Sequence, residues 1–151
     1  MIAAALVAAV VVDRRCPAAR VHYGADARVT GSLRSLPWVQ TSNGAFTGHL
    51  FYWSATSWGR ARAPRAQIFT TVVQGPVNPK VLWISRGAAT GQLMIRGRRL
   101  DGTGSFQWRA GYVAGYQHPS YVPIPSVGCW RVLVSSGRLS GSVVFRAVNH
   151  S

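Results

Sequence analysis

The sequence contains no glutamate, a single lysine and only three acidic residues. Soluble helices usually carry Glu and Lys on the side that faces water, so this composition argues against a largely helical chain. The three carboxylates are Asp13, Asp26 and Asp101. The first two fall in or near a predicted leader, and Asp101 stands in a predicted turn, so no carboxylate pair for hydrolysis is predicted.

Cysteine is also scarce, with only Cys16 and Cys129. No Cys-x-x-Cys pattern occurs, which excludes a zinc site built on cysteines. The two residues can form a disulfide only if Cys16 remains in the mature chain; otherwise Cys129 is a small buried core residue. Phosphate-binding, dinucleotide-binding and Gly-x-Ser-x-Gly motifs are missing as well. No cofactor or metal ion is predicted.

Arginine is abundant and sets a formal net charge of +14. Such a charge attracts polyanions, among them nucleic acid, anionic lipid and acidic wall polymers. The arginines are scattered rather than massed in one run, so the alternative is that a GC-rich genome supplies them without a functional reason.

Residues 1–12 are wholly apolar, too short to span a bilayer and of the length of a signal-peptide core. We therefore expect a leader over residues 1–27, a single domain over 28–151, and a secreted or envelope location without a transmembrane segment. The run lacks a basic flank, and the alternative is a buried N-terminal strand. Arg15 precedes Cys16 where a lipoprotein signal needs a small residue, so lipid anchoring there is not supported.

The rest of the chain shows short apolar or alternating runs separated by Gly, Pro and Asp. This spacing predicts an all-β, antiparallel, immunoglobulin-like β-sandwich of seven to eight strands. The prolines at 119, 123 and 125 restrict their segment to a sheet edge or a connection. We expect Trp83, Trp108 and Trp130 in the core. Expected strands cover 27–33, 46–54, 67–74, 80–85, 93–98, 105–110, 129–135 and 141–148, with a loop over 57–65, turns over 75–79 and 87–91, and a long connection over 111–126.

Two pieces together carry a resemblance: Asn78-Pro-Lys-Val-Leu-Trp83, and Pro119-Ser…Pro125…Gly128-Cys-Trp130 before two closing strands. They resemble uncharacterised secreted or lipoprotein domains of Gram-positive and related bacteria, which share N-x-K-x-L-W and P-x-x-G-C-W strands. The resemblance covers roughly residues 45–148. It implies an immunoglobulin-like fold and no catalytic residues.

Two loop stretches combine aromatic residues with charge. In the first, Trp58, Arg60, Arg62 and Arg65 could hold phosphate or carboxylate groups beside an indole ring. In the second, the tyrosines at 112, 116 and 121 are spaced by glycines and resemble a stacking platform, and the predicted binding residues are Tyr112, Tyr116 and His118. The alternative interpretation is that these aromatics fold back and cover the ends of the sandwich.

These patterns favour an exported, non-enzymatic module that binds an anionic, glycan or protein partner at the cell surface or envelope. A nucleic-acid-binding protein is the first alternative, although no nucleic-acid-binding signature is present. The second alternative is a hydrolase that uses His118.

Overall fold

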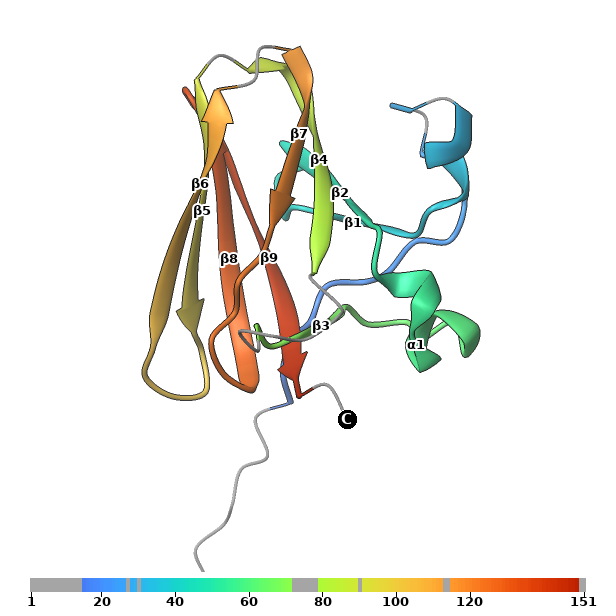
Figure 1. The fold of residues 1–151 in the computed structure, drawn as a ribbon, viewed down its shortest axis with the longest axis vertical. Helices are drawn as coiled ribbons and strands as arrows, with labels where there is room; N and C mark the ends of the chain where they lie inside the picture. The colour runs from blue at the N-terminus through green and yellow to red at the C-terminus, as the bar shows by residue number, and fades with distance from the viewer. Residues whose placement is uncertain are drawn as a thin grey trace, which may run out of the picture.

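The computed structural model describes residues 15–26, 28–29, 31–71, 79–89, 91–112 and 115–149. Nine strands within these residues form two sheets that lie face to face (Figure 1). The chain is therefore an all-β sandwich, which confirms the predicted fold class. In the same residues, no helix has the length and apolar character needed to cross a membrane.

The four-stranded sheet is antiparallel throughout and has the order β1-β2-β4-β7. Its strands are β1 (Trp38–Gln40), β2 (Phe46–Leu50), β4 (Lys80–Ala89) and β7 (Gly115–Tyr121). β7 lies at the sheet edge and contains Pro119. A proline fits there because an edge strand has one side without ladder partners.

The five-stranded sheet has the order β3-β9-β8-β5-β6. Its strands are β3 (Gln67–Phe69), β5 (Gln92–Arg99), β6 (Ser105–Tyr112), β8 (Gly128–Ser136) and β9 (Leu139–Val148). β3 pairs with β9 in parallel, whereas the other pairs are antiparallel. The prediction of a purely antiparallel sandwich is thus wrong for this sheet edge, because side-chain alternation carries no information on pairing direction.

Large aromatic side chains fill the space between the sheets. Trp53, Trp83 and Trp130 are fully buried, together with Phe46 and Phe145. Trp108 is half-buried and packs against this cluster. The predicted core tryptophans therefore do line the interior.

The N-terminal segment ties the two sheets together. Cys16 forms a disulfide with Cys129 in β8. The Ala19 amide donates to the Val144 carbonyl in β9, and the His22 amide to the Trp38 carbonyl in β1. The first 14 residues of the predicted leader lie outside the described residues, whereas 15–26 form this part of the fold. A leader that ended before Cys16 would leave the disulfide intact.

A second apolar cluster covers the outer face of the four-stranded sheet. Val29 and Leu33 pack there on Leu82 and Ile84, and the segment that carries them runs along the right of Figure 1. Beneath the same layer, β2 is buried along its whole length.

Several local expectations were wrong. The strand predicted over 27–33 is replaced from Gly31 by a 3-10 helix, η1 (Gly31–Ser35); Gly31 has a φ of 68°, which interrupts extended backbone. The strand predicted over 46–54 ends at Leu50 and is followed by a 3-10 helix, η2 (Trp53–Ala55). A one-turn helix, α1 (Ser57–Arg60), opens the predicted loop, because the Thr56 hydroxyl accepts from the Gly59 amide as an N-cap.

Two further differences concern strand length. The predicted connection over 111–126 contains β7, which pairs with β4. The predicted turn over 87–91 begins too early, since β4 continues to Ala89 after an irregularity in its pairing. The strand predicted over 67–74 is observed only as β3, and residues 72–78, with most of the predicted turn over 75–79, lie outside the described residues.

Candidate anion-binding surface

Four arginines lie on three neighbouring strands of the outer face of the five-stranded sheet. Their neighbours along the strands, such as Ile95 and Val132, are fully buried in the core. Because successive strand residues point to opposite faces, the arginine side chains point to solvent. We call this set the arginine face: Arg96 and Arg98 in β5, Arg109 in β6, and Arg131 in β8.

The strand register brings these charges close together. Arg98 stands directly opposite Arg131 across the β5–β8 ladder. Like charges placed opposite each other on a sheet destabilise it. Arg96 donates from Nε to Gln107 Oε1 at 3.3 Å, but within the described residues the side chains of Arg98 and Arg131 have no hydrogen-bond or ion-pair partner.

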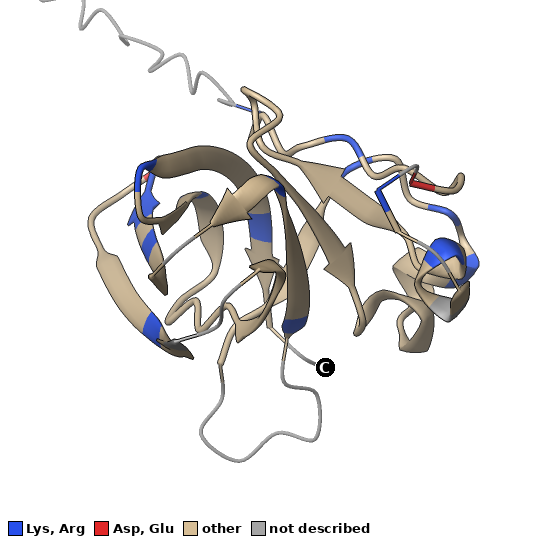
Figure 2. Cartoon of the chain, turned by 90° about the horizontal axis from the view of Figure 1, so that it is seen from above, with Lys and Arg blue, Asp and Glu red and all other residues tan. Residues whose placement is uncertain are grey.

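No carboxylate on the described strands neutralises the arginine face. Asp26 is buried and lies 3.2 Å from His49, and Asp101 pairs with Arg99 at 2.9 Å in the β5–β6 turn. Figure 2 shows the same imbalance, with blue segments on both halves of the molecule and very little red. The face therefore presents unneutralised positive charge to solvent.

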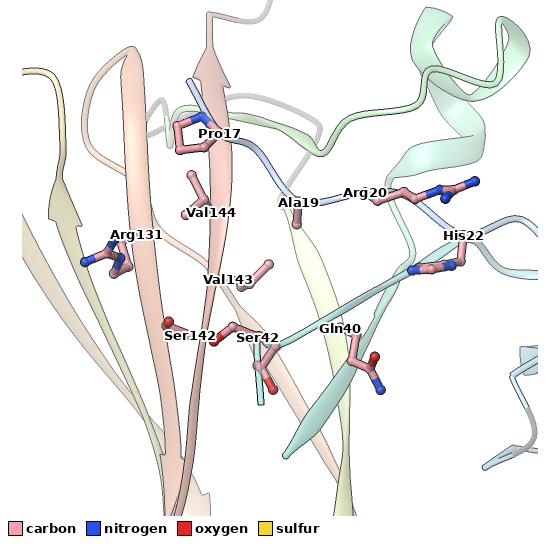
Figure 3. A pocket seen from close by; sticks show the side chains of 11 residues that line it. Pro17, Ala19, Arg20, His22, Gln40, Ser42, Arg131, Ser142, Val143 and Val144 are labelled. Carbon is pink, nitrogen blue, oxygen red and sulfur yellow. The ribbon is translucent and has the colours of Figure 1, made fainter. Parts of the chain in front are cut away.

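A groove continues from the arginine face toward the N-terminal segment (Figure 3). Its volume is about 510 Å³, and Arg131 and Ser142 lie on the sheet side. Arg20 and His22 lie at the other end, and the heads of Arg131 and Arg20 point away from each other. The groove therefore suits an extended ligand better than one compact anion.

The first predicted stretch is only partly available to a ligand. Trp58 is half-buried, with its ring centroid 5.5 Å from that of Trp53 and 4.5 Å from that of Phe69. This packing favours the interpretation that the indole covers the sandwich. Arg60 is exposed at the end of α1, and the Arg62 guanidinium lies 4.7 Å from the Tyr23 ring centroid.

Arg65 lies apart from these residues, beside the disulfide. It is exposed, and its Nη1 donates to the Ala18 carbonyl at 3.2 Å. The four residues of this stretch therefore do not converge on one ligand.

The second predicted stretch is divided between surface and core. Tyr116 is 56% exposed, whereas His118 is only 1% exposed, and the side chain of Tyr112 lies outside the described residues. In Figure 1, the start of β7 and the helix α1 lie toward opposite ends of the molecule. The two predicted stretches therefore do not share one end of the sandwich.

His118 faces the interior of the sandwich. Neither of its ring nitrogens has a partner of hydrogen-bonding geometry in the described residues. Burial lowers the pKa of His118, and the nearby Gly115 backbone opposes that shift in part. A buried, neutral imidazole has no route to a dissolved substrate.

A buried Asp–His pair was not foreseen from the sequence. His49 Nε2 lies 3.2 Å from Asp26 Oδ2, and both residues are buried. Burial lowers the pKa of His49, and Asp26 opposes that shift. Nδ1 of His49 has no described partner, so the pair lacks the adjacent nucleophile of a catalytic triad. The spacing of the two residues gave no signal, since Asp26 stood within the predicted leader.

Metal binding has no structural support in the part of the chain described. No group of three His, Cys, Asp or Glu side chains there lies close enough to hold an ion.

The chain matches no family model, no curated protein and no solved structure. The resemblance to secreted bacterial domains, and the immunoglobulin-like connectivity it implies, therefore stay predictions.

Proposed function

We propose that this chain is an exported, non-enzymatic β-sandwich module that binds an anionic polymer of the cell envelope through its arginine face. The observation that carries the proposal is the unneutralised cluster of Arg96, Arg98, Arg109 and Arg131. Arginine suits this role because its guanidinium group binds phosphate, sulfate or carboxylate groups in a fork.

The spacing of the charges favours a polymer over a small ligand. Arg96 and Arg98 are two residues apart on one strand, which places their Cα atoms about 6.7 Å apart, and neighbouring strands lie about 4.8 Å apart. Repeated anionic groups along a chain could contact several of these arginines at once. The groove in Figure 3 offers the same polymer a continuation past Arg131.

Two features support export. Disulfides persist mainly in oxidising compartments, and Cys16 is joined to Cys129. The apolar run at residues 1–12 has the length of a signal-peptide core. Mass spectrometry of the exported protein should find a mature N-terminus before Cys16; an N-terminus after it would contradict the proposal.

The arginine face would also attract nucleic acid, because phosphate is the common chemistry. Unpaired bases stack on exposed aromatic rings. Among the described side chains of the outer face, the exposed large hydrophobic residue is Leu133, which is not aromatic. This favours an envelope polymer. The hydrolase alternative loses its support because His118 is buried.

The test compares two triple variants that remove the same charge. Arg96→Gln/Arg98→Gln/Arg131→Gln removes most of the face, and Arg34→Gln/Arg86→Gln/Arg138→Gln removes exposed arginines elsewhere. Retention on dextran sulfate and on neutral dextran is measured between about 50 and 200 mM salt, with single- and double-stranded DNA as a second pair of probes.

We expect the wild type and the second triple to bind dextran sulfate in a salt-dependent manner. The face triple should bind weakly, with a slope of log K against log salt reduced by up to about 3. An equal loss in both triples would show that total charge, not the face, governs binding. Binding to DNA at least as tight as to dextran sulfate would favour the nucleic-acid alternative.

A further inference from the structure

A second cationic site lies beside the disulfide. It is a hollow of about 690 Å³, within the range of about 300–1,000 Å³ typical of small-molecule sites. We call it the disulfide basin, and its lining residues are Arg15, Cys16, Pro17, Ala18, Arg65, Gln67 and Arg146.

The strand register builds this basin. Gln67 in β3 stands opposite Arg146 in β9, and Arg146 stands opposite Cys129 in β8. Cys129 is bonded to Cys16, with the two Cα atoms 5.4 Å apart. One row across three strands therefore ends at the disulfide, which fixes the N-terminal segment as the wall of the basin.

Three guanidinium groups border the basin from separate backbone segments. Arg65 precedes β3 and is held by its 3.2 Å hydrogen bond to the Ala18 carbonyl. Arg146 is exposed and has no hydrogen-bond or ion-pair partner for its side chain among the described residues. Arg15 is adjacent to the disulfide. No carboxylate lines the basin, so nothing on its walls offsets the three charges.

The chemistry of these walls selects the ligand. A phosphomonoester carries close to two negative charges at neutral pH and three free acceptor oxygens, enough to pair with three arginines. A carboxylate offers one charge and two oxygens. Pro17, Ala18 and the disulfide form an apolar side, against which the uncharged body of such a ligand could pack.

We propose that the disulfide basin binds a phosphomonoester group, such as that of a sugar phosphate or of a phosphate-bearing lipid. The basin adjoins the arginine face on the same sheet, since Arg146 stands opposite Cys129, two residues along β8 from Arg131. It differs in having the N-terminal segment as a wall, and it would bind a small ligand rather than a polymer. The disulfide serves this site because it keeps Arg15 beside the other two arginines.

The test is isothermal titration calorimetry with four probes in low-salt buffer at neutral pH. Glucose 6-phosphate and inorganic phosphate present the group, glucose lacks it, and dihexanoyl phosphatidic acid presents it on a lipid. The variants are Arg65→Gln/Arg146→Gln and Arg15→Gln, and the matched control is Arg34→Gln/Arg86→Gln, which removes two exposed arginines that line neither the basin nor the arginine face. Thermal unfolding checks that each variant remains folded.

We expect saturable binding of the phosphorylated probes and none of glucose. Each basin variant should lower the affinity about tenfold or more, because one or two charge-assisted contacts are lost, whereas the control should bind as the wild type does. The probe that binds more tightly, glucose 6-phosphate or the lipid, identifies whether the phosphomonoester comes from a sugar phosphate or from a lipid.

Absence of saturable binding, or equal affinity in Arg65→Gln/Arg146→Gln and the wild type, would overturn the proposal. The arginine face is judged separately by dextran sulfate. If the protein is retained by dextran sulfate but does not bind phosphate, only the proposal for the basin is refuted. If it binds phosphate but is not retained by dextran sulfate, only the proposal for the arginine face is refuted.

Discussion

The disulfide between Cys16 and Cys129 is expected to supply a large share of the stability of this fold. It closes a loop with a sequence separation of 113 residues. The chain-entropy relation gives about 4.8 kcal/mol at 25 °C for a loop of that length, and losses of about 2–5 kcal/mol are typical when native disulfides are removed. A domain of this size has about 5–15 kcal/mol in total.

The perturbation is Cys16→Ser/Cys129→Ser, since a single substitution would leave a reactive thiol. Urea unfolding can be followed by tryptophan fluorescence, because Trp53, Trp83 and Trp130 are fully buried. We expect the free energy of unfolding to fall by about 3–5 kcal/mol. The m-value should rise, since an unfolded chain without the cross-link exposes more surface. Chemically reduced wild-type protein should behave like the variant.

A loss below about 1 kcal/mol with an unchanged m-value would refute this reasoning, because the cross-link would then not restrict the unfolded chain. Two free thiols in protein produced under oxidising conditions would refute its premise.

Two other perturbations test the packing of buried residues. In Gly97→Ala, the new Cβ would overlap the Phe106 ring, so urea unfolding should show a loss of about 1–3 kcal/mol. Gly87→Ala is the control, since nothing lies within 4 Å there, and an equal loss in both would contradict the packing. Burial lowers the pKa of His118 from 6.5, so the unfolded chain binds the proton more readily and stability should decline as the pH falls below about 6.5. In His118→Phe, urea unfolding at about pH 5 and pH 8 should show a weaker decline, and an unchanged pH dependence would contradict this explanation.

The sequence was sufficient to predict a strand where the strand's own residues show which side faces the core. β5, β8 and β9 alternate between core and solvent over their length, and that pattern is local. β7 was missed for a related reason. Its proline and the glycine before Tyr116 are typical of a connection, and only its pairing with β4 at the sheet edge makes it a strand.

Only part of the arginine face could be predicted from the sequence. The alternation in Arg96-Gly97-Arg98 places two charges on one side of a strand. The opposition of Arg98 and Arg131 depends on the β5–β8 register, which no local pattern determines. The disulfide basin is harder still to predict from the sequence. Its prediction requires knowing that β3 pairs with β9 in parallel and that Cys16 bonds to Cys129.

The arginine face lowers the free energy of unfolding, and the rest of the fold must offset this loss. Cross-strand pairs change stability by about 0.2–1 kcal/mol, and directly opposed like charges act unfavourably. Removing a buried ring such as Trp130 would cost about 3–5 kcal/mol, so the core and the disulfide tolerate the Arg98–Arg131 pair easily. A substitution at Arg131 should therefore weaken polyanion binding without lowering the free energy of unfolding. Because binding and stability should change independently at Arg131, the binding experiments test the arginine face itself rather than the integrity of the sandwich.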